Sequence, residues 1–199
     1  EALAGFDVRT ITVRAEPYGA TAPYRVLRDP VRALLGVERG THDEMADAVR
    51  SGVRRLAPEL IAFAPLLGDV VTVSMPETPE VRAIEPRFRP DRIADLILRL
   101  VETTFPGQLL MRVEEGHWAD AASAHVLARF AAEAPRRPWA LLVTRRDDGG
   151  FDPAGERVDL APLGDDVIRR LVIAATAATP MRPHEIDEVV RRAGGNPLF

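Results

Sequence analysis

The chain has 199 residues, of which 46% are hydrophobic and 28% charged, a composition typical of a globular protein with one domain or slightly more. Its 30 acidic and 26 basic residues give a net charge of −4, which offers no electrostatic basis for binding nucleic acid or an anionic membrane. Cysteine and lysine are absent, which excludes disulfides, cysteine zinc sites and any phosphate-binding loop that ends in Gly-Lys-Ser/Thr. Because the sequence begins at Glu1 and ends on the apolar pair Leu198-Phe199, we expect an internal piece of a longer protein.

The first half of the chain predicts one strand followed by helices. Val8–Arg14 alternates apolar and polar residues and is rich in β-branched side chains, which predicts a strand. A loop rich in Gly, Ala and Pro follows over Glu16–Pro23, and Pro30 predicts a kink or a break in the next helix. The expected helices are Tyr24–Leu35, Asp43–Leu56, Pro58–Leu67 and one that begins after Pro90, with a surface loop over Val70–Phe88 before the last.

The second half predicts strands that alternate with helices. Near-continuous apolar runs over Gln108–Glu115 and Trp139–Thr144 indicate buried parallel strands, and Asp120 is a suitable N-cap for a helix between them. This alternation predicts an α/β fold with a parallel sheet over residues 1–162, followed by a small helical lid over 163–199. The remaining expected elements are a helix at Ala121–Ala134, a short strand at Arg157–Leu160 and helices at Asp165–Ala178 and Pro183–Ala193.

Two adjacent acids, Glu114 and Glu115, close the first of the buried strands. Since the carboxyl ends of parallel strands open onto the ligand crevice of an α/β sheet, the pair is suited to metal and water chemistry. In that interpretation Glu114 holds a Mg²⁺ hydration shell and Glu115 orients or deprotonates an attacking water. A solvated loop after a core strand explains the same two residues equally well.

The residues around the acid pair also have structural interpretations beside functional ones. His117 next to Trp118 is typical of a packing or capping pair, and the functional alternative is a catalytic role for His117. Thr144 and Arg145 close the neighbouring strand, where they are either a γ-phosphate sensor or the start of a solvated loop. Gly194–Pro197 predicts a helix C-cap and a turn, which leaves room for a ligand contact by the same turn.

Four segments, which follow one another along the chain in the order of the family, resemble the ATPase module of bacterial STAND-class regulators, which are AAA-like P-loop ATPases; the segment named last below comes first in the chain. Glu114–Ser123 reads Glu-Glu-Gly-His-Trp-Ala-Asp-Ala-Ala-Ser and is similar to their extended Walker B segment, Glu-Asp-x-His-Trp-Ala-Asp-x-x-Ser. Trp139–Arg146 resembles their sensor strand, Gly195–Phe199 their Gly-x-Pro turn, and Ala15–Tyr24 the segment that follows their phosphate loop. The modules linked to class III adenylyl/guanylyl cyclases are the most similar, and others are linked to LuxR-type transcription regulators.

The resemblance implies an ATP-binding and hydrolysing regulatory switch in a cytoplasmic multidomain signalling protein, with ATP and Mg²⁺ as cofactors of the intact protein. The implied partners are ATP or ADP, adjacent cyclase or DNA-binding domains and helical repeats of the same chain, and a second copy in nucleotide-dependent self-association. Direct contacts with nucleic acid or membrane are not implied, and His117, Trp118 and Asp120 match family positions without a derived role. The residues that the resemblance places at the catalytic, metal and nucleotide site are Glu114, Glu115, Thr144, Arg145, Gly195, Asn196 and Pro197.

Departures from the family pattern keep a second interpretation open, a catalytically decayed and non-hydrolysing interaction scaffold. The phosphate loop is missing, so no tight binding of ATP and Mg²⁺ to this chain is expected. Glu115 stands where Asp is usual, and the extra methylene shifts the carboxylate by about 1 Å, enough to lower a rate. Arg112 stands in mid-strand where an aliphatic residue is usual, and we expect it to pair with Glu114 or Glu115 because a buried unpaired arginine is costly.

The resemblance also implies the sheet order 5-1-4-3-2, in which this chain supplies strands 2, 3, 4 and 5 and lacks strand 1. Val8–Arg14, Leu109–Glu115 and Trp139–Thr144 are then expected to form a continuous parallel ladder. Arg157–Leu160 would lie about 10 Å from Trp139–Thr144, two strand spacings away. We therefore expect these two segments not to pair, and Arg157–Leu160 need not form a strand at all. The free edge of Trp139–Thr144 is expected to recruit another chain or to aggregate.

Overall fold

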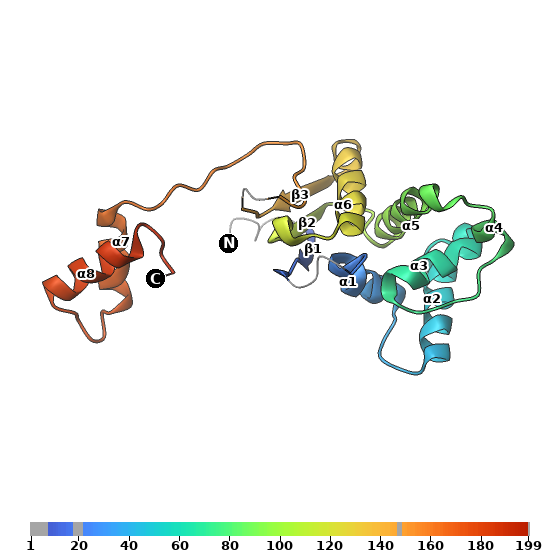
Figure 1. Ribbon diagram of the computed structural model, residues 1–199, viewed down its shortest axis with the longest axis horizontal. Coiled ribbons are helices and arrows are strands. Elements are labelled where there is room, and N and C mark those ends of the chain that lie inside the picture. The colour runs from blue at the N-terminus through green and yellow to red at the C-terminus, as the bar shows by residue number, and fades with distance from the viewer. Residues whose placement is uncertain (1–7, 18–21, 147–148, 199) are drawn as a thin grey trace. The chain divides into compact units, whose positions relative to one another are not determined.

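The structure is a computed structural model that describes residues 8–17, 22–146 and 149–198 (Figure 1). The chain divides into two compact units, Glu1–Ala154 with the sheet and most of the helices, and Gly155–Phe199 with two helices. Residues 18–21 of the predicted loop lie outside the described residues, as does Phe199 of the predicted turn.

The sheet consists of three parallel strands in the order β1 (Arg9–Arg14), β2 (Leu109–Glu114) and β3 (Trp139–Val143). In the observed register Arg9 lies opposite Leu109, and Leu109 lies opposite Trp139. The predicted α/β class, the parallel direction and the continuous three-strand ladder are confirmed. All three strands therefore end at the same edge, which places the residues that follow β2 and β3 side by side.

The predicted strand at Arg157–Leu160 is wrong, because these residues form no strand. Val158 and Leu160 are 74% and 92% exposed, so this short segment buries almost no apolar surface, and no neighbouring strand pairs with its backbone. The expectation that it would not pair with β3 is confirmed. Among the described residues, no strand lies on the outer edge of β3.

Helices of the first unit follow the predicted pattern with two corrections. Of the kink or break predicted at Pro30, the break is wrong, because the first helix continues through this residue. The segment predicted as a surface loop begins inside a helix, and Val70, Val71, Val73 and Val81 of this segment are fully buried. Within the described residues no helix is both long and apolar enough to cross a membrane. The elements are α1 (Arg25–Leu35), α2 (His42–Leu56), η2 (Pro58–Phe63), α3 (Ala64–Val71), α4 (Pro79–Arg82), η3 (Pro86–Phe88), α5 (Arg89–Thr104), η4 (Gly116–Trp118), α6 (Ala121–Glu133) and η5 (Ala134–Arg136).

Among the described residues of this unit, the helices lie on one face of the sheet (Figure 1). The covered face is apolar, and its β2 residues Leu109, Met111 and Val113 are at most 4% exposed. The opposite face is exposed at Arg112 and at Leu142, which is 50% exposed. The prediction of fully buried strands is thus wrong for half of the side chains, because only every second residue of a strand points toward the helices.

The second unit is a pair of helices, α7 (Asp165–Ala175) and α8 (Pro183–Ala193). Ile168 of α7 packs with Ile186 and Val190 of α8 in a small core. The helix α8 ends at Gly194, whose φ of 53° gives the left-handed C-cap that the sequence predicts.

Candidate functional site

The carboxyl edge of the sheet brings together three of the predicted site residues, Glu114, Glu115 and Thr144. The ladder extends past the strands, since the Thr144 N–H donates to the Val113 carbonyl (2.9 Å) and the Gly116 N–H donates to the Thr144 carbonyl (2.8 Å). The Glu115 N–H donates to the Thr144 hydroxyl oxygen at 3.3 Å. Thr144 thus contacts Glu115 through its side chain, and its backbone bonds to Val113 and Gly116 on either side of the acid pair.

Glu115 adopts a left-handed backbone conformation with φ of 56°. This conformation is unfavourable for a residue with a Cβ, and it turns the chain sharply from β2 into η4. Gly116 follows with little space around it, because a Cβ there would lie 2.8 Å from a methyl group of Val143. The turn exposes the Glu115 side chain, which is 42% accessible, at the edge of the sheet.

Glu114 lies between two arginines on the exposed face of the sheet. One of its carboxylate oxygens is 3.4 Å from Nε of Arg112, and the other is 3.6 Å from Nε of Arg14. The predicted pairing of Arg112 with an acid is confirmed, although its side chain is 46% exposed rather than buried. Sequence reasoning missed Arg14, which the parallel register places directly opposite Glu114.

Asp120 is buried and fully occupied by hydrogen bonds from the protein. Its carboxylate accepts the backbone N–H (2.8 Å) and the hydroxyl (2.6 Å) of Ser123, which confirms it as the N-cap of α6. It also accepts the backbone N–H groups of Tyr24 (2.9 Å) and Arg25 (3.1 Å) at the start of α1. Asp120 therefore joins the beginnings of two helices beside the edge, and has no lone pair directed at a ligand.

His117 and Trp118 lie in η4, immediately after the acid pair. The His117 side chain is 1% exposed, and its ring lies 4.8 Å from the Trp118 ring in a tilted arrangement. Nδ1 of His117 accepts the backbone N–H of Arg146 at 3.3 Å. The predicted packing pair is present, and it is attached to the segment that follows β3.

The Arg145 side chain contacts the loop that follows β3. Its guanidinium forms an ion pair with Asp152 at 2.6 Å and donates to the carbonyls of Arg146 (3.0 Å) and Gly149 (3.2 Å). Asp152 and Gly149 gave no signal in the sequence, because they belong to a segment without periodicity. Of the two predicted sensor residues, only Thr144 contacts the acid pair.

The predicted turn residues Gly195, Asn196 and Pro197 lie in the second unit. Gly195 has φ of 84° and packs so closely that a Cβ would lie 2.5 Å from Pro162. Its carbonyl accepts the N–H of Leu163 at 2.9 Å. The turn therefore closes α8 onto the segment that leads into α7, as a C-cap and turn.

Metal ligation at this edge is limited to isolated carboxylates. Within the described residues, no group of three or more His, Asp or Glu side chains is arranged to hold a metal ion. The exposed oxygens of Glu114 and Glu115 are the hard ligands that Mg²⁺ prefers, and Mg²⁺ usually takes only one or two carboxylates besides water and phosphate. The two carboxylates are oxygen ligands of the kind that Mg²⁺ uses, and by themselves they do not form a metal site.

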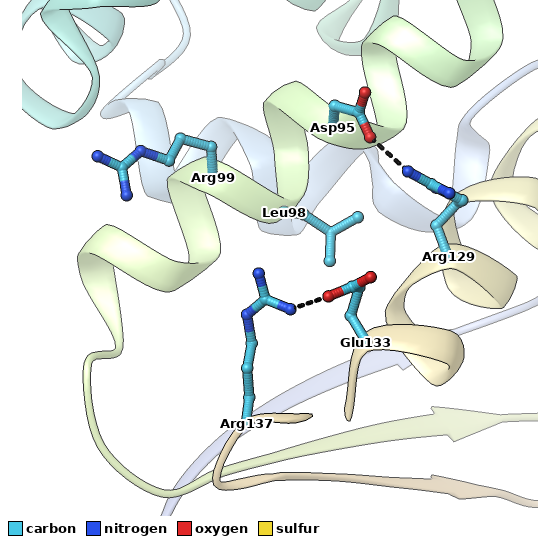
Figure 2. Close-up of a pocket in the computed structure, with 6 residues that line it drawn as sticks. All are labelled: Asp95, Leu98, Arg99, Arg129, Glu133 and Arg137. Atoms are coloured by element: carbon cyan, nitrogen blue, oxygen red, sulfur yellow. Dashed lines mark hydrogen bonds and ion pairs between the residues drawn. The ribbon is translucent and has the colours of Figure 1, made fainter. Parts of the chain in front are cut away.

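A separate hollow of about 230 Å³ lies between α5 and α6, away from the predicted site. Figure 2 shows two ion pairs, Arg129 with Asp95 and Arg137 with Glu133, on either side of Leu98. The first pair is 2.8 Å long and joins the two helices. Because these charged groups are paired with one another, the hollow is a seam of ion pairs between helices.

Comparison with known protein families, with curated proteins and with solved structures finds no match to this chain.

Proposed function

We propose that this chain forms one edge of an ATP-binding and hydrolysing switch in a cytoplasmic multidomain signalling protein, linked to a nucleotide cyclase or to transcription. The proposal is supported by the juxtaposition of Glu114, Glu115 and Thr144 at the carboxyl edge of a parallel sheet. Open α/β sheets bind their ligands at this edge.

Each of the three residues has a separate task in the proposed reaction. The accessible Glu115 carboxylate orients the attacking water and accepts its proton. The Thr144 hydroxyl accepts the Glu115 amide and keeps its own proton for an outside acceptor such as a phosphate oxygen. Glu114 would hold the hydration shell of Mg²⁺, which when bound neutralises charge on the phosphates.

In this proposal the phosphate loop comes from outside these 199 residues, because they contain no lysine to complete a Gly-Lys-Ser/Thr motif. We expect calorimetry on the 199-residue chain to show no Mg-dependent ATP site of micromolar strength, since the backbone amides and lysine of a phosphate loop normally hold the nucleotide. A tight site in this chain alone would contradict the proposed division of the nucleotide site.

The decisive experiment is Glu115→Gln in a polypeptide that contains both this chain and a phosphate loop. Hydrolysis should slow by roughly 10²-fold or more, as for the loss of a positioned base, while ATP binding stays nearly unchanged. The matched control is Glu38→Gln, which neutralises an exposed glutamate between α1 and α2. Equal rates for Glu115→Gln and the unmodified protein would show that Glu115 is not the base.

A second candidate function, a non-hydrolysing interaction scaffold, is favoured by the surroundings of Glu114. Both of its carboxylate oxygens face guanidinium groups, those of Arg112 at 3.4 Å and Arg14 at 3.6 Å, which reduces the charge available to a Mg²⁺ shell. A scaffold of this kind does not hydrolyse ATP, so substitution of Glu115 would not change a rate of hydrolysis. If the unmodified protein does not hydrolyse ATP above the uncatalysed rate but self-associates with ATP, the scaffold is the correct function.

A further inference from the structure

His117 is enclosed at the carboxyl edge although its side chain is polar. It is 1% exposed, and Gly150 packs against it so closely that a Cβ on that glycine would lie 2.4 Å from the His117 backbone. The next residue, Phe151, donates its N–H to the Gly116 carbonyl at 3.0 Å. Gly150 and Phe151 therefore pack against the backbone of η4.

The hydrogen bond to the His117 ring determines which nitrogen carries the proton. Nδ1 accepts the Arg146 N–H at 3.3 Å, so a neutral ring has its proton on Nε2. Within the described residues this buried Nε2 has no hydrogen-bond partner. A buried donor without an acceptor is unfavourable, which favours movement of a nearby acceptor toward it.

The nearest such acceptor is the carboxylate of Glu115, whose oxygen lies 3.6 Å from Nε2 of His117. The backbone of Glu115 is held by its bond to Thr144, whereas its side chain is 42% exposed. A small rotation of that side chain brings the two atoms within hydrogen-bonding distance, normally 2.7–3.2 Å.

We propose that His117 is a positioning residue that donates its Nε2–H to the Glu115 carboxylate and so links the orientation of Glu115 to the segment after β3. The importance of this orientation for hydrolysis rests on the proposed function, whereas the His117–Glu115 contact itself does not. The link runs from the Arg146 amide through the imidazole ring to the carboxylate. A displacement of Arg146 would therefore reorient Glu115 through the imidazole ring.

Nuclear magnetic resonance on the 199-residue chain tests the contact without any hydrolysis. We expect the His117 ring nitrogens to show the Nε2–H form, and the Nε2 signal to move in Glu115→Gln. His125, exposed and bound to Asp91 through its own Nε2 at 2.8 Å, is the internal control whose signals stay unchanged. An Nδ1–H form, or a His117 signal that ignores Glu115→Gln, overturns the proposal.

Two substitutions of His117 separate positioning from packing in the polypeptide that hydrolyses ATP. His117→Phe keeps the bulk and removes the donor, and we expect kcat to fall about 10- to 100-fold with the KM for ATP unchanged. His117→Gln places an amide N–H near the position of Nε2 and should restore most of kcat. If kcat falls equally in both variants and both are partly unfolded, His117 has a packing role and the proposal is overturned. An unchanged kcat in His117→Phe also overturns it.

The two sets of outcomes keep this inference separate from the proposed function. If Glu115→Gln leaves hydrolysis unchanged, the proposed function fails, while the nuclear magnetic resonance result still decides whether His117 contacts Glu115. If Glu115→Gln abolishes hydrolysis but His117→Phe does not reduce it, Glu115 is the base and His117 does not position it.

Discussion

The two faces of the three-stranded sheet differ sharply in what they contribute. On the covered face, Leu109 and Val113 of β2 are at most 1% exposed and pack beneath helices. On the other face, Arg112 of the same strand is nearly half-exposed and pairs with Glu114, and Leu142 of β3 is 50% exposed. Parallel sheets are ordinarily covered on both faces, so this one-sided burial is unusual.

The residues that stabilise the fold and the residues of the proposed chemistry therefore lie on different faces of the same strands. The helix layer holds the covered face, whereas Glu114 belongs to the exposed face and Thr144 continues that face past the end of β3. Substitutions on the exposed face should therefore alter chemistry with little effect on folding, and substitutions on the covered face should do the reverse.

The strongest test of the comparison substitutes one leucine on each face. Leu109→Ala should lower the free energy of unfolding by about 2–5 kcal/mol, because it leaves a cavity under the helices. Leu142→Ala removes the same atoms from an exposed position, and it should change the free energy of unfolding by no more than about 0.5 kcal/mol. Urea denaturation of both variants measures the difference, and equal losses would mean that the second face is covered as well.

The next largest effect is expected at Asp120, which joins the beginnings of α1 and α6 beside the carboxyl edge. Asp120→Ala removes the N-cap of α6 and leaves the buried N–H of Tyr24 without its acceptor, which should cost about 2–4 kcal/mol. Asp120→Asn keeps one acceptor oxygen, and its free energy of unfolding should fall by less than that of Asp120→Ala. If the denaturation curves of both variants coincide with that of the unmodified chain, the hydrogen bonds of Asp120 do not stabilise the fold.

Sequence patterns predicted those parts of the fold that depend on local periodicity. The three strands, the amphipathic helices and the caps at Asp120 and Gly194 all follow from spacing and capping chemistry. The strand expected at Arg157–Leu160 failed because a strand also requires a neighbour, which no local pattern reveals. The one-sided burial of β2 was missed for a related reason, since an apolar run does not show how many faces are covered.

The candidate site was predictable where it follows from strand ends. Glu114, Glu115 and Thr144 come together because parallel strands that end in register place their following residues side by side. Two features had no local signal, the pairing of Arg14 with Glu114 and the hydrogen bond between Arg146 and His117. Both depend on contacts between segments far apart in the sequence, which only the register and the packing determine.

A smaller effect is expected for Arg112→Leu on the exposed face. The substitution removes a half-exposed ion pair with Glu114, and such pairs contribute about 0–1 kcal/mol. The free energy of unfolding of the 199-residue chain should therefore change by less than about 1 kcal/mol, and the change should be smaller in high salt. Arg129→Leu, which removes a similarly exposed pair with Asp95 between α5 and α6, is the matched control. A loss of several kcal/mol in Arg112→Leu alone would contradict an exposed face.

The smallest expected effect appears only in alkaline solution, and concerns Tyr24 where the helix layer meets the carboxyl edge. Burial of the phenol, together with the nearby carboxylates of Asp69 and Asp120, raises the pKa of Tyr24 above its ordinary value. The folded chain therefore holds this proton more tightly than the unfolded chain. The resulting stability is fully present below the unfolded pKa of about 10, and decreases as the pH rises beyond it.

Tyr24→Phe tests this sign directly, because it keeps the buried ring and removes the ionisable hydroxyl. The free energy of unfolding of the unmodified chain should fall between pH 9 and pH 11 more steeply than that of Tyr24→Phe, while the difference between the two stays constant below pH 9. Denaturation at these pH values measures both slopes. Parallel slopes would mean that Tyr24 ionises as easily in the folded chain as in the unfolded one, and that the layer at this edge is as open to water as the exposed face of the sheet.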